Sequence, residues 1–493
     1  MLACKVLVKM KNKQSALSNS VSHVVDILGS TVGRDQPIML VQTALELVNT
    51  LGDEVFLDEN VVFLDPFCKA GEILLAIGMR LNKATKKLMN VNKICATLYT
   101  QNRIFGLAPD ERHWLLSLRT FLGNEKSHDL EQAKIIKNGA YLSEENGNAD
   151  LPKFKTELIK MIEYISARKP GCKVIAIGNP PYQEADGGFG KSAKPVYNFF
   201  SDALMECEAI SQFVLVIPAR WFGGGKGLDD FREKIISSKH IRNLRYFKNA
   251  AEVFPTVDIN GGVCFLQWDK SHVGKTNFAD GTFAKEISLS KWDIIPDDPM
   301  AFEIVEKLQK CWPGKWVGDV AWAGKPFGLR TFYFDRNAEV SRNSRNAVPC
   351  LSIRRIIKYA DISDITKNLD KIDLWKVCVP KAAGGSKGNR RSTVPKNLIM
   401  LVPSGTITTE TYNIVHAFKT KIQAENMLEF LKTDFARYLV GTRKITQDLP
   451  KDRWNWVPLL DMKETWDDEK LFKFFGFSKK EQEHIKAKVE EWS

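Results

Sequence analysis

The chain has 493 residues, of which 44% are hydrophobic and 26% are charged, and this length exceeds what one hydrophobic core usually organises. These values exclude a disordered, collagen-like or coiled-coil protein and predict a folded protein of two or more domains. Neither the nine cysteines nor the seven histidines show metal-site or disulfide-framework spacing, which suits a reducing cytoplasm and predicts no metal site. No run of about 18 apolar residues occurs, so we expect no membrane anchor.

The net charge of +12 is concentrated in one region. Residues 341–460 contain 21 Lys/Arg and 10 Asp/Glu, a surplus of 11 that leaves +1 for the rest of the chain. A solvated surface is the simpler interpretation, but the concentration favours a domain that binds a polyanion, above all nucleic acid.

Short apolar strands alternate with helical patterns over the first half of the chain. This alternation predicts an α/β fold with a doubly wound, mostly parallel sheet, whose ligands bind at the carboxyl ends of the strands. Closely spaced strands at 245–268 predict an antiparallel edge. The expected strands are 61–64, 103–107, 173–178 and 213–218, and the expected helices are 36–50, 71–89, 111–123 and 197–207.

The alternation stops after about residue 285, where we place a domain boundary. Residues 1–285 form the predicted α/β domain. Residues 286–493 mix short strands, basic loops and a helical tail from about 468, which predicts a second domain of mixed α+β structure.

Asn179-Pro180-Pro181-Tyr182 directly follows an apolar strand. The two prolines fix the backbone and remove two donors, so an amide oxygen, a rigid carbonyl and an aromatic face lie together. This set suits an exocyclic amine: its N–H groups would be accepted by Asn179 and by the Pro180 carbonyl, and Tyr182 would stack on the attached ring. A proline-rich turn with an Asx cap is the structural alternative.

A second candidate site is the turn Asp65-Pro66-Phe67-Cys68-Lys69-Ala70-Gly71, between a strand and a helix. Ala70 and Gly71 allow close approach of a ligand to the backbone, and Asp65 at the strand end can accept polar hydrogens.

With these two motifs in this order, the sequence resembles the γ-class N6-adenine DNA methyltransferases of restriction-modification systems, in the type IIG and type I-like group. The resemblance extends to IPARWFGGGKGLDDFR (217–232), FPTVDINGGVCFLQWD (254–269), GKPFGLRT (324–331) and TQDLPKDRWNWVPLLD (446–461). It implies a Rossmann-like methyltransferase domain over 1–285 and a target-recognition domain over 286–493. Such enzymes transfer a methyl group from S-adenosylmethionine to the N6 of an adenine flipped out of the duplex.

The resemblance also implies roles for particular residues. Asn179, Pro180, Pro181 and Tyr182 would hold and stack the adenine, and Phe254 would pack against it from another side. Asp65, Pro66, Phe67 and Gly71 would bind the cofactor.

The cofactor site departs from the family pattern at three places. Lys69 replaces the first glycine of the loop, and we expect its long side chain to point outward. Gln36-Pro37 stands where the family has Thr-Pro, at the cofactor's carboxylate end. The acid that usually binds the ribose follows the second strand directly, whereas here Asp110 or Glu111 would have to take its place.

Basic residues outside the catalytic motifs are predicted to bind double-stranded DNA, mostly through phosphates. They are Lys191, Lys194, Lys387, Arg390, Arg391, Arg443 and Lys444. The sequence leaves open the recognition site, the oligomeric state and whether a helicase or nuclease restriction subunit acts with this chain.

Two alternatives remain at this stage. One is a methyltransferase that acts on a protein glutamine or on RNA, because the same motif suits those planar amines. The other is a catalytically silent DNA-binding subunit, which the altered cofactor loop would permit.

Overall fold

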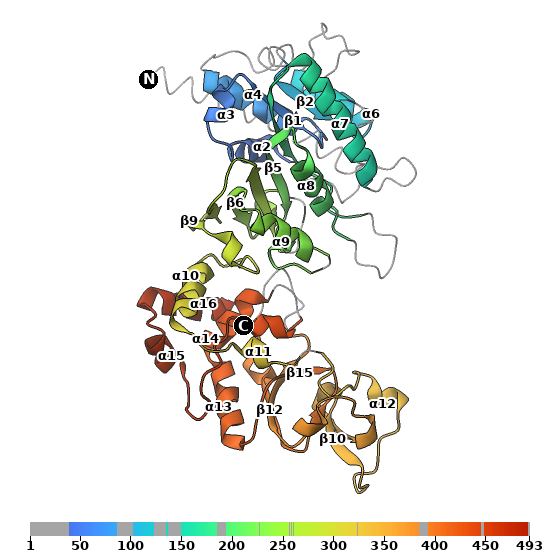
Figure 1. The fold of residues 1–493 in the computed structure, drawn as a ribbon, viewed down its shortest axis with the longest axis vertical. Coiled ribbons are helices and arrows are strands. Elements are labelled where there is room, and N and C mark those ends of the chain that lie inside the picture. The colour runs from blue at the N-terminus through green and yellow to red at the C-terminus, as the bar shows by residue number, and fades with distance from the viewer. Residues whose placement is uncertain are drawn as a thin grey trace. The chain divides into compact units, whose positions relative to one another are not determined.

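The computed structural model describes residues 39–85, 102–122, 135–136, 149–184, 194–225, 227–255, 257, 259, 261–322, 324–383, 393–444 and 448–491. The chain divides into two compact units, Met1–Ile295 (unit 1) and Pro296–Ser493 (unit 2), which Figure 1 shows in blue to yellow and in yellow to red. The division falls ten residues after the predicted boundary at 285. None of the described helices has the length and apolar content needed to cross a membrane.

Unit 1 is built on a nine-stranded sheet with the order β3-β2-β1-β4-β5-β7-β6-β8-β9 among the described residues. Strands β1 to β5 pair in parallel, and β7 runs antiparallel between β5 and β6. This arrangement confirms the predicted doubly wound α/β sheet with an antiparallel edge. The strands are β1 (Val61–Asp65), β2 (Ile104–Leu107), β3 (Ile135–Ile136), β4 (Lys173–Gly178), β5 (Ile210–Pro218), β6 (Ile241–Phe247), β7 (Val263–Asp269), β8 (Thr276–Ala279) and β9 (Ala284–Ile287).

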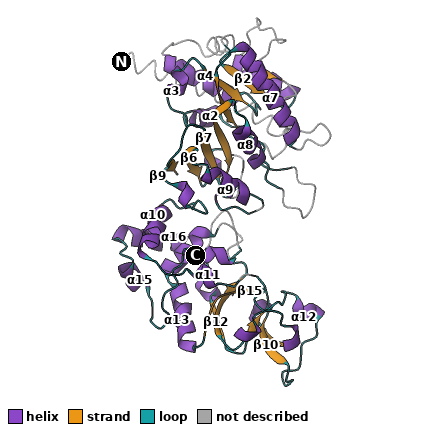
Figure 2. Ribbon diagram, viewed as in Figure 1, coloured by secondary structure: helices purple, strands orange, loops and turns teal. Residues whose placement is uncertain are grey.

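Helices cover the parallel part of this sheet on both faces, as Figure 2 shows in purple around the orange strands. Because both faces are covered, every residue of β1 and β2 is buried, whichever face its side chain points to. The helices of unit 1 are α2 (Val41–Val48), α3 (Glu54–Leu57), α4 (Glu72–Thr85), α6 (Glu111–Leu122), α7 (Leu151–Arg168), α8 (Tyr197–Glu206) and α9 (Asp229–Ser237).

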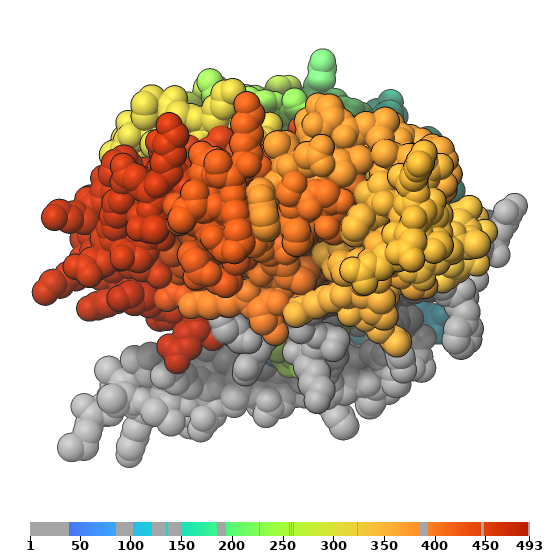
Figure 3. Space-filling model, turned by 90° about the horizontal axis from the view of Figure 1, so that it is seen from below, coloured from blue at the N-terminus to red at the C-terminus, as the bar shows by residue number. Residues whose placement is uncertain are grey.

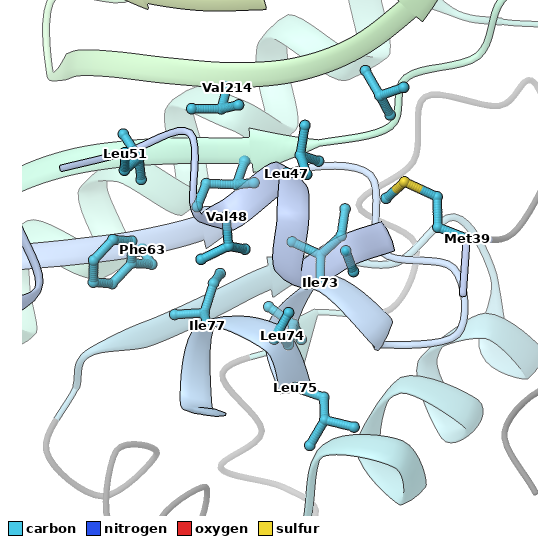
Figure 4. Close-up of a cluster of buried hydrophobic side chains, with 14 of the residues drawn as sticks. Met39, Leu47, Val48, Leu51, Phe63, Ile73, Leu74, Leu75, Ile77 and Val214 are labelled. Atoms are coloured by element: carbon cyan, nitrogen blue, oxygen red, sulfur yellow. The ribbon is translucent and has the colours of Figure 1, made fainter. Parts of the chain in front are cut away.

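The core on one face joins α2, α4, β1 and β5. Figure 4 shows Leu47 and Val48 of α2 pointing toward Ile73 and Ile77 of α4, with Phe63 of β1 beside them. All these side chains are at most 1% exposed. On the other face, Phe154 of α7 and Phe200 of α8 pack against the loop after β1. The carboxyl edge of β1 is therefore fixed by packing from both sides.

Unit 2 contains two three-stranded sheets and a group of helices. One sheet has the order β11-β10-β14 and the other β13-β12-β15. The strands are β10 (Ala347–Leu351), β11 (Ile357–Asp361), β12 (Trp375–Pro380), β13 (Met400–Val402), β14 (Ile407–Thr408) and β15 (Tyr412–Phe418). The helices are α10 (Met300–Cys311), α11 (Val317–Val320), α12 (Tyr333–Arg336), α13 (Lys421–Lys432), α14 (Asp434–Arg443), α15 (Asp468–Phe474) and α16 (Lys479–Glu491).

Gly71, which begins the turn into α4, is required by both its backbone and its surroundings. Its φ is +78°, and a Cβ there would lie 2.8 Å from the Cα and carbonyl oxygen of Ser117 in α6. We expect Gly71→Ala to lower the free energy of unfolding by about 2–5 kcal/mol, because left-handed strain and overpacking add. Chemical denaturation measures this difference.

Gly171 provides the matched control, since its φ is +73° but nothing lies within 4 Å of its Cβ position. Gly171→Ala should cost only the backbone strain, about 1–2 kcal/mol. Equal losses for the two variants would show that the contact with Ser117 is unimportant.

Candidate active site

The two predicted sites lie side by side because the strands that precede them are neighbours. Strand β1 pairs in parallel with β4, with Phe63 opposite Ile175 and Leu64 opposite Ala176. Strand β1 ends at Asp65 and β4 ends at Gly178, one residue before Asn179. Both loops therefore leave the same edge of the sheet from adjacent strands, as the sequence predicted.

The two loops also touch. A Cβ at Gly178 would lie 2.6 Å from the ring of Phe67, so only glycine lets that ring lie against the end of β4. The Phe67 ring stacks on Phe154 with a centroid distance of 5.2 Å and meets Phe200 edge-on at 5.5 Å. Phe67, predicted to bind cofactor, thus has its side chain in the core, where it couples the two loops.

Three ionisable side chains are buried together in the loop after β1. Asp65, Lys69 and Glu72 are each 2% exposed. The prediction that Lys69 points outward is therefore wrong: the lysine lies inside, where the carboxylates of Glu72 and Asp65 stabilise its charge. Burial is tolerated because opposite charges partly replace the lost hydration.

Burial shifts the pKa values of these groups. Burial, together with the nearby charge of Glu72, raises the pKa of Asp65 to about 7, although the hydrogen bond from the Phe67 N–H opposes this rise. Burial lowers the pKa of Lys69 to about 8 although both carboxylates favour its charged form. Near neutral pH, this loop therefore holds a carboxyl group poised to change its charge.

Glu72 holds the loop through hydrogen bonds, a role that was not predicted from the sequence. Its carboxylate accepts hydrogen bonds from the backbone N–H of Ala70 at 3.1 Å and of Met39 at 3.4 Å. Ser117 of α6 donates from its hydroxyl to the Lys69 carbonyl at 3.4 Å. The loop is thus held by the segment before α2 and by α6. In the sequence, the signal for the burial of Lys69 is the pair of acids four residues before it and three residues after it.

Asn179 and the aromatic residues predicted to contact a base are all buried in unit 1. Asn179 is 1% exposed, directly after β4. The rings of Tyr182 and Phe254 meet edge-on, with centroids 6.2 Å apart and planes at 73°. The structure thus places Tyr182 and Phe254 in direct contact with one another, and their predicted packing on two sides of a base stays a prediction. Separation of these rings would be needed before a planar base could lie between them.

Asp110 and Glu111 lie at the start of α6, beyond the end of β2. The Asp110 carboxylate accepts from the His113 N–H at 2.9 Å and lies 2.8 Å from His113 Nδ1. These hydrogen bonds outweigh burial and lower the pKa of Asp110 to about 2. Asp110 therefore caps the helix, and a ribose contact by Asp110 or by the exposed Glu111 stays a prediction.

The structure distributes the predicted DNA-binding residues unevenly. Lys194 is exposed, at a point where Gln183 and Pro195 form an antiparallel bridge. Arg443 and Lys444 are instead 1% and 3% exposed, and the Arg443 guanidinium lies over the Trp456 ring at 4.5 Å. Because these two side chains are buried, they pack inside unit 2, and their burial argues against contacts with DNA phosphates at the surface. Gln36, Pro37, Lys191, Lys387, Arg390 and Arg391 lie outside the described residues.

The fold and the two adjoining loops are typical of one class of protein: an α/β domain with a candidate ligand site at the carboxyl edge of its parallel strands. Residues 102–254 match the model of the Eco57I restriction-modification methylase family. The matched range includes Asn179, Tyr182 and Phe254. This part of the chain thus matches a restriction-modification methylase domain, and the match confirms the predicted class of protein.

A curated relative agrees with this class. The chain is 23% identical over 294 residues to an uncharacterized adenine-specific methylase of Mycoplasma pneumoniae, and the match covers 50% of this chain and 69% of the relative. The chain is thus a homologue of an adenine-specific methylase, as the sequence motifs predicted.

Two solved structures are similar in a looser way. The type IIG restriction endonuclease BpuSI matches with a TM-score of 0.41 and 13% identity, over 96% of this chain and 68% of that one. A modification subunit of a putative type I restriction enzyme from Vibrio vulnificus matches with a TM-score of 0.32 and 12% identity. That match covers 52% of this chain, which spans about half (49%) of the Vibrio chain.

The raised pKa of Asp65 predicts a pH-dependent difference in stability between the protein and Asp65→Asn. The unfolded carboxyl releases its proton near pH 4, whereas the folded one keeps it to about pH 7. The protein should therefore lose stability relative to Asp65→Asn as pH rises from about 4 to 7, by at most about 1.4 kcal/mol per pH unit. Urea titrations at several pH values measure this slope.

Asp58→Asn serves as the control, because the hydrogen bond from the Asn60 N–H lowers the pKa of Asp58. The difference in free energy of unfolding between the protein and Asp58→Asn should change with pH in the opposite direction, and it should change at lower pH. A pH-independent difference for Asp65→Asn would contradict the burial of an ionisable Asp65.

Proposed function

We propose that this chain transfers a methyl group from S-adenosylmethionine to the N6 of an adenine in double-stranded DNA, within a restriction-modification system. The observation that carries the proposal is the adjacency of the Asp65–Gly71 loop and the Asn179–Tyr182 motif at the ends of β1 and β4. One loop suits a cationic cofactor and the other a planar amine, so donor and acceptor would meet at one edge of the sheet.

The residues of the first loop fit S-adenosylmethionine, which supplies a methyl group on a positively charged sulfur when bound. Ionised Asp65, Lys69 and Glu72 would together carry a net charge of −1, and a bound ligand with one net positive charge would favour this ionised state over the partly neutral state that burial favours. The carboxylates would hold the ligand's ammonium group, and Lys69 its carboxylate. The left-handed Gly71 lets the backbone turn closely beside them.

The second loop would position the reacting amine. The Asn179 side-chain oxygen and the Pro180 carbonyl would accept the two N–H groups of adenine N6, which directs the nitrogen lone pair toward the methyl group. Tyr182 and Phe254 would stack on the base after their edge-on contact opens. No general base is needed for the attack, because the amine loses its proton afterwards; positioning and electrostatics supply the catalysis.

Unit 2 would bind the DNA around the target adenine. The surplus of 11 positive charges over residues 341–460 lies within this unit, and the match to the methylase family ends before it. Contacts between basic residues and phosphates would provide affinity, and base contacts would choose the site. The energy of these contacts would offset the few kcal/mol that flipping the adenine costs.

The first test is Asn179→Ala, assayed with tritiated S-adenosylmethionine and duplex DNA. We expect methyl transfer to fall about 100-fold or more, because the amine loses a preorganised acceptor. Cofactor affinity measured by calorimetry should stay within a few-fold. Asp65→Ala should show the reverse order, with weakened cofactor binding as the primary defect.

The control is Asn277→Ala, which removes the same amide from an exposed position on β8. It should methylate at the parental rate. Near-parental transfer by Asn179→Ala would disprove the assignment of the motif. A protein that binds no S-adenosylmethionine would favour the silent DNA-binding subunit, and label in RNA or protein alone would favour the other alternative.

The second test concerns the basic segment of the sequence with Lys387, Arg390 and Arg391. Replacing all three with Ala should weaken binding to cognate and to scrambled duplexes by similar factors. It should also flatten the slope of log K against log salt by up to about three units, because each lost phosphate contact reduces the slope by about 0.9. Binding curves at several salt concentrations measure both effects. Loss of cognate binding alone would show that these residues read bases, and unchanged binding to both duplexes would show that the segment does not contact DNA.

A further inference from the structure

A strained turn joins the antiparallel strands β10 and β11 of unit 2. The strands pair up to Leu351 opposite Ile357. The Ser352 N–H and hydroxyl both donate to the Ile356 carbonyl, at 2.8 and 2.9 Å, and the Ile356 N–H donates to the Ile353 carbonyl. The two residues at the centre of this tight turn are Arg354 and Arg355.

Both arginines adopt the left-handed conformation, with φ of 59° and 65°. Such turns normally carry Asn-Gly or similar residues, because a Cβ disfavours this backbone. Among the described residues, no other consecutive pair of non-glycine residues has positive φ. Strain of this kind persists where the surrounding structure enforces it and is concentrated at functional sites.

The surrounding structure does enforce this turn. The Arg355 N–H donates to the Tyr412 hydroxyl of β15 at 3.1 Å, and the Arg355 guanidinium donates to the Asn397 carbonyl at 2.8 Å. Arg354, in contrast, is exposed and has no hydrogen bond or ion pair with any residue that the structure describes. One arginine therefore fixes the turn while the other presents its guanidinium to solvent.

The surface around the turn is basic and apolar at once. Residues 340–360 contain five basic residues and no Asp or Glu. Ile353, Ile356 and Ile357 are 41%, 51% and 47% exposed. In Figure 3 this part of the chain, in gold, lies at the surface of unit 2. Positive charge attracts a polyanion, and the exposed isoleucines offer the apolar contact that base edges accept but phosphates do not.

We propose that the turn Ile353–Ile356 enters the DNA major groove, where Arg354 reads a guanine in the recognition site. The inference rests on the proposed function, which makes duplex DNA the partner. The major groove admits a two-stranded β-ribbon, and an arginine can donate two hydrogen bonds to guanine O6 and N7. Arg355 is the positioning residue. A fixed direction for Arg354 matters for reading a base edge, whereas a phosphate contact needs no strained backbone.

The test uses the full chain and the variant Arg354→Gly, which removes the guanidinium and relieves the strain at that position. Duplexes that bind are selected from a random-sequence pool, and the methylated motif is read separately by modified-base sequencing. The parental chain should require a guanine at one position. In Arg354→Gly, the preference for guanine over the other bases at this position should fall by about tenfold to a hundredfold. The melting temperature of this variant should be unchanged or higher.

Arg345→Ala is the matched control, since Arg345 is an exposed arginine of the same basic segment without positive φ. It should keep the guanine requirement. Equal weakening of all sequences by Arg354→Gly, with a flatter salt dependence, would show a phosphate contact and overturn the proposal, as would an unchanged motif. Selection of guanine-containing duplexes without methylation would leave the turn's role intact and refute the proposed enzymatic function.

Discussion

The parallel pairing of β1 with β4 is the constraint on which the candidate site depends. It sets Asp65 and Asn179 at the ends of adjacent strands although 113 positions separate them in the sequence. The pairing is reinforced beyond the sheet, because Gly178 leaves room for the Phe67 ring, which packs on Phe154 and Phe200. A change in this packing would move both loops together.

The charges of the first loop show how a departure from the family pattern can be accommodated. A lysine at a loop position usually held by glycine would be costly inside the protein if it were alone. Here Asp65 and Glu72 lie beside Lys69, and Glu72 also ties the loop to the N–H groups of Ala70 and Met39. The altered loop is thus a compact buried cluster of charged side chains, which is the feature that the proposed binding of a cationic cofactor depends on.

The sequence predicted the sheet of unit 1 well because its strands are short apolar runs bounded by clear turn residues, such as Asp65-Pro66 after β1. The contact between the rings of Tyr182 and Phe254 was not predicted, because the family resemblance implied only that each ring packs against a base. The prediction from sequence failed for Lys69, because residue type alone predicts exposure for lysine. The flanking acids Asp65 and Glu72 are visible in the sequence, but that they are buried beside the lysine is seen only in the folded loop. The two small sheets of unit 2 were not predicted, since strands as short as Ile407–Thr408 show no usable period. The left-handed arginines of the β10–β11 turn give no sequence signal at all, because arginine is unusual there.

The central claim is that one edge of the sheet brings a methyl donor to the amine of adenine. The most direct measurement incubates the purified chain with duplex DNA and methyl-labelled S-adenosylmethionine, digests the DNA to nucleosides and identifies the labelled product by mass spectrometry. The account predicts N6-methyldeoxyadenosine as the labelled nucleoside. Label on cytosine, or a chain that binds S-adenosylmethionine and duplex DNA but labels no nucleoside, would contradict it.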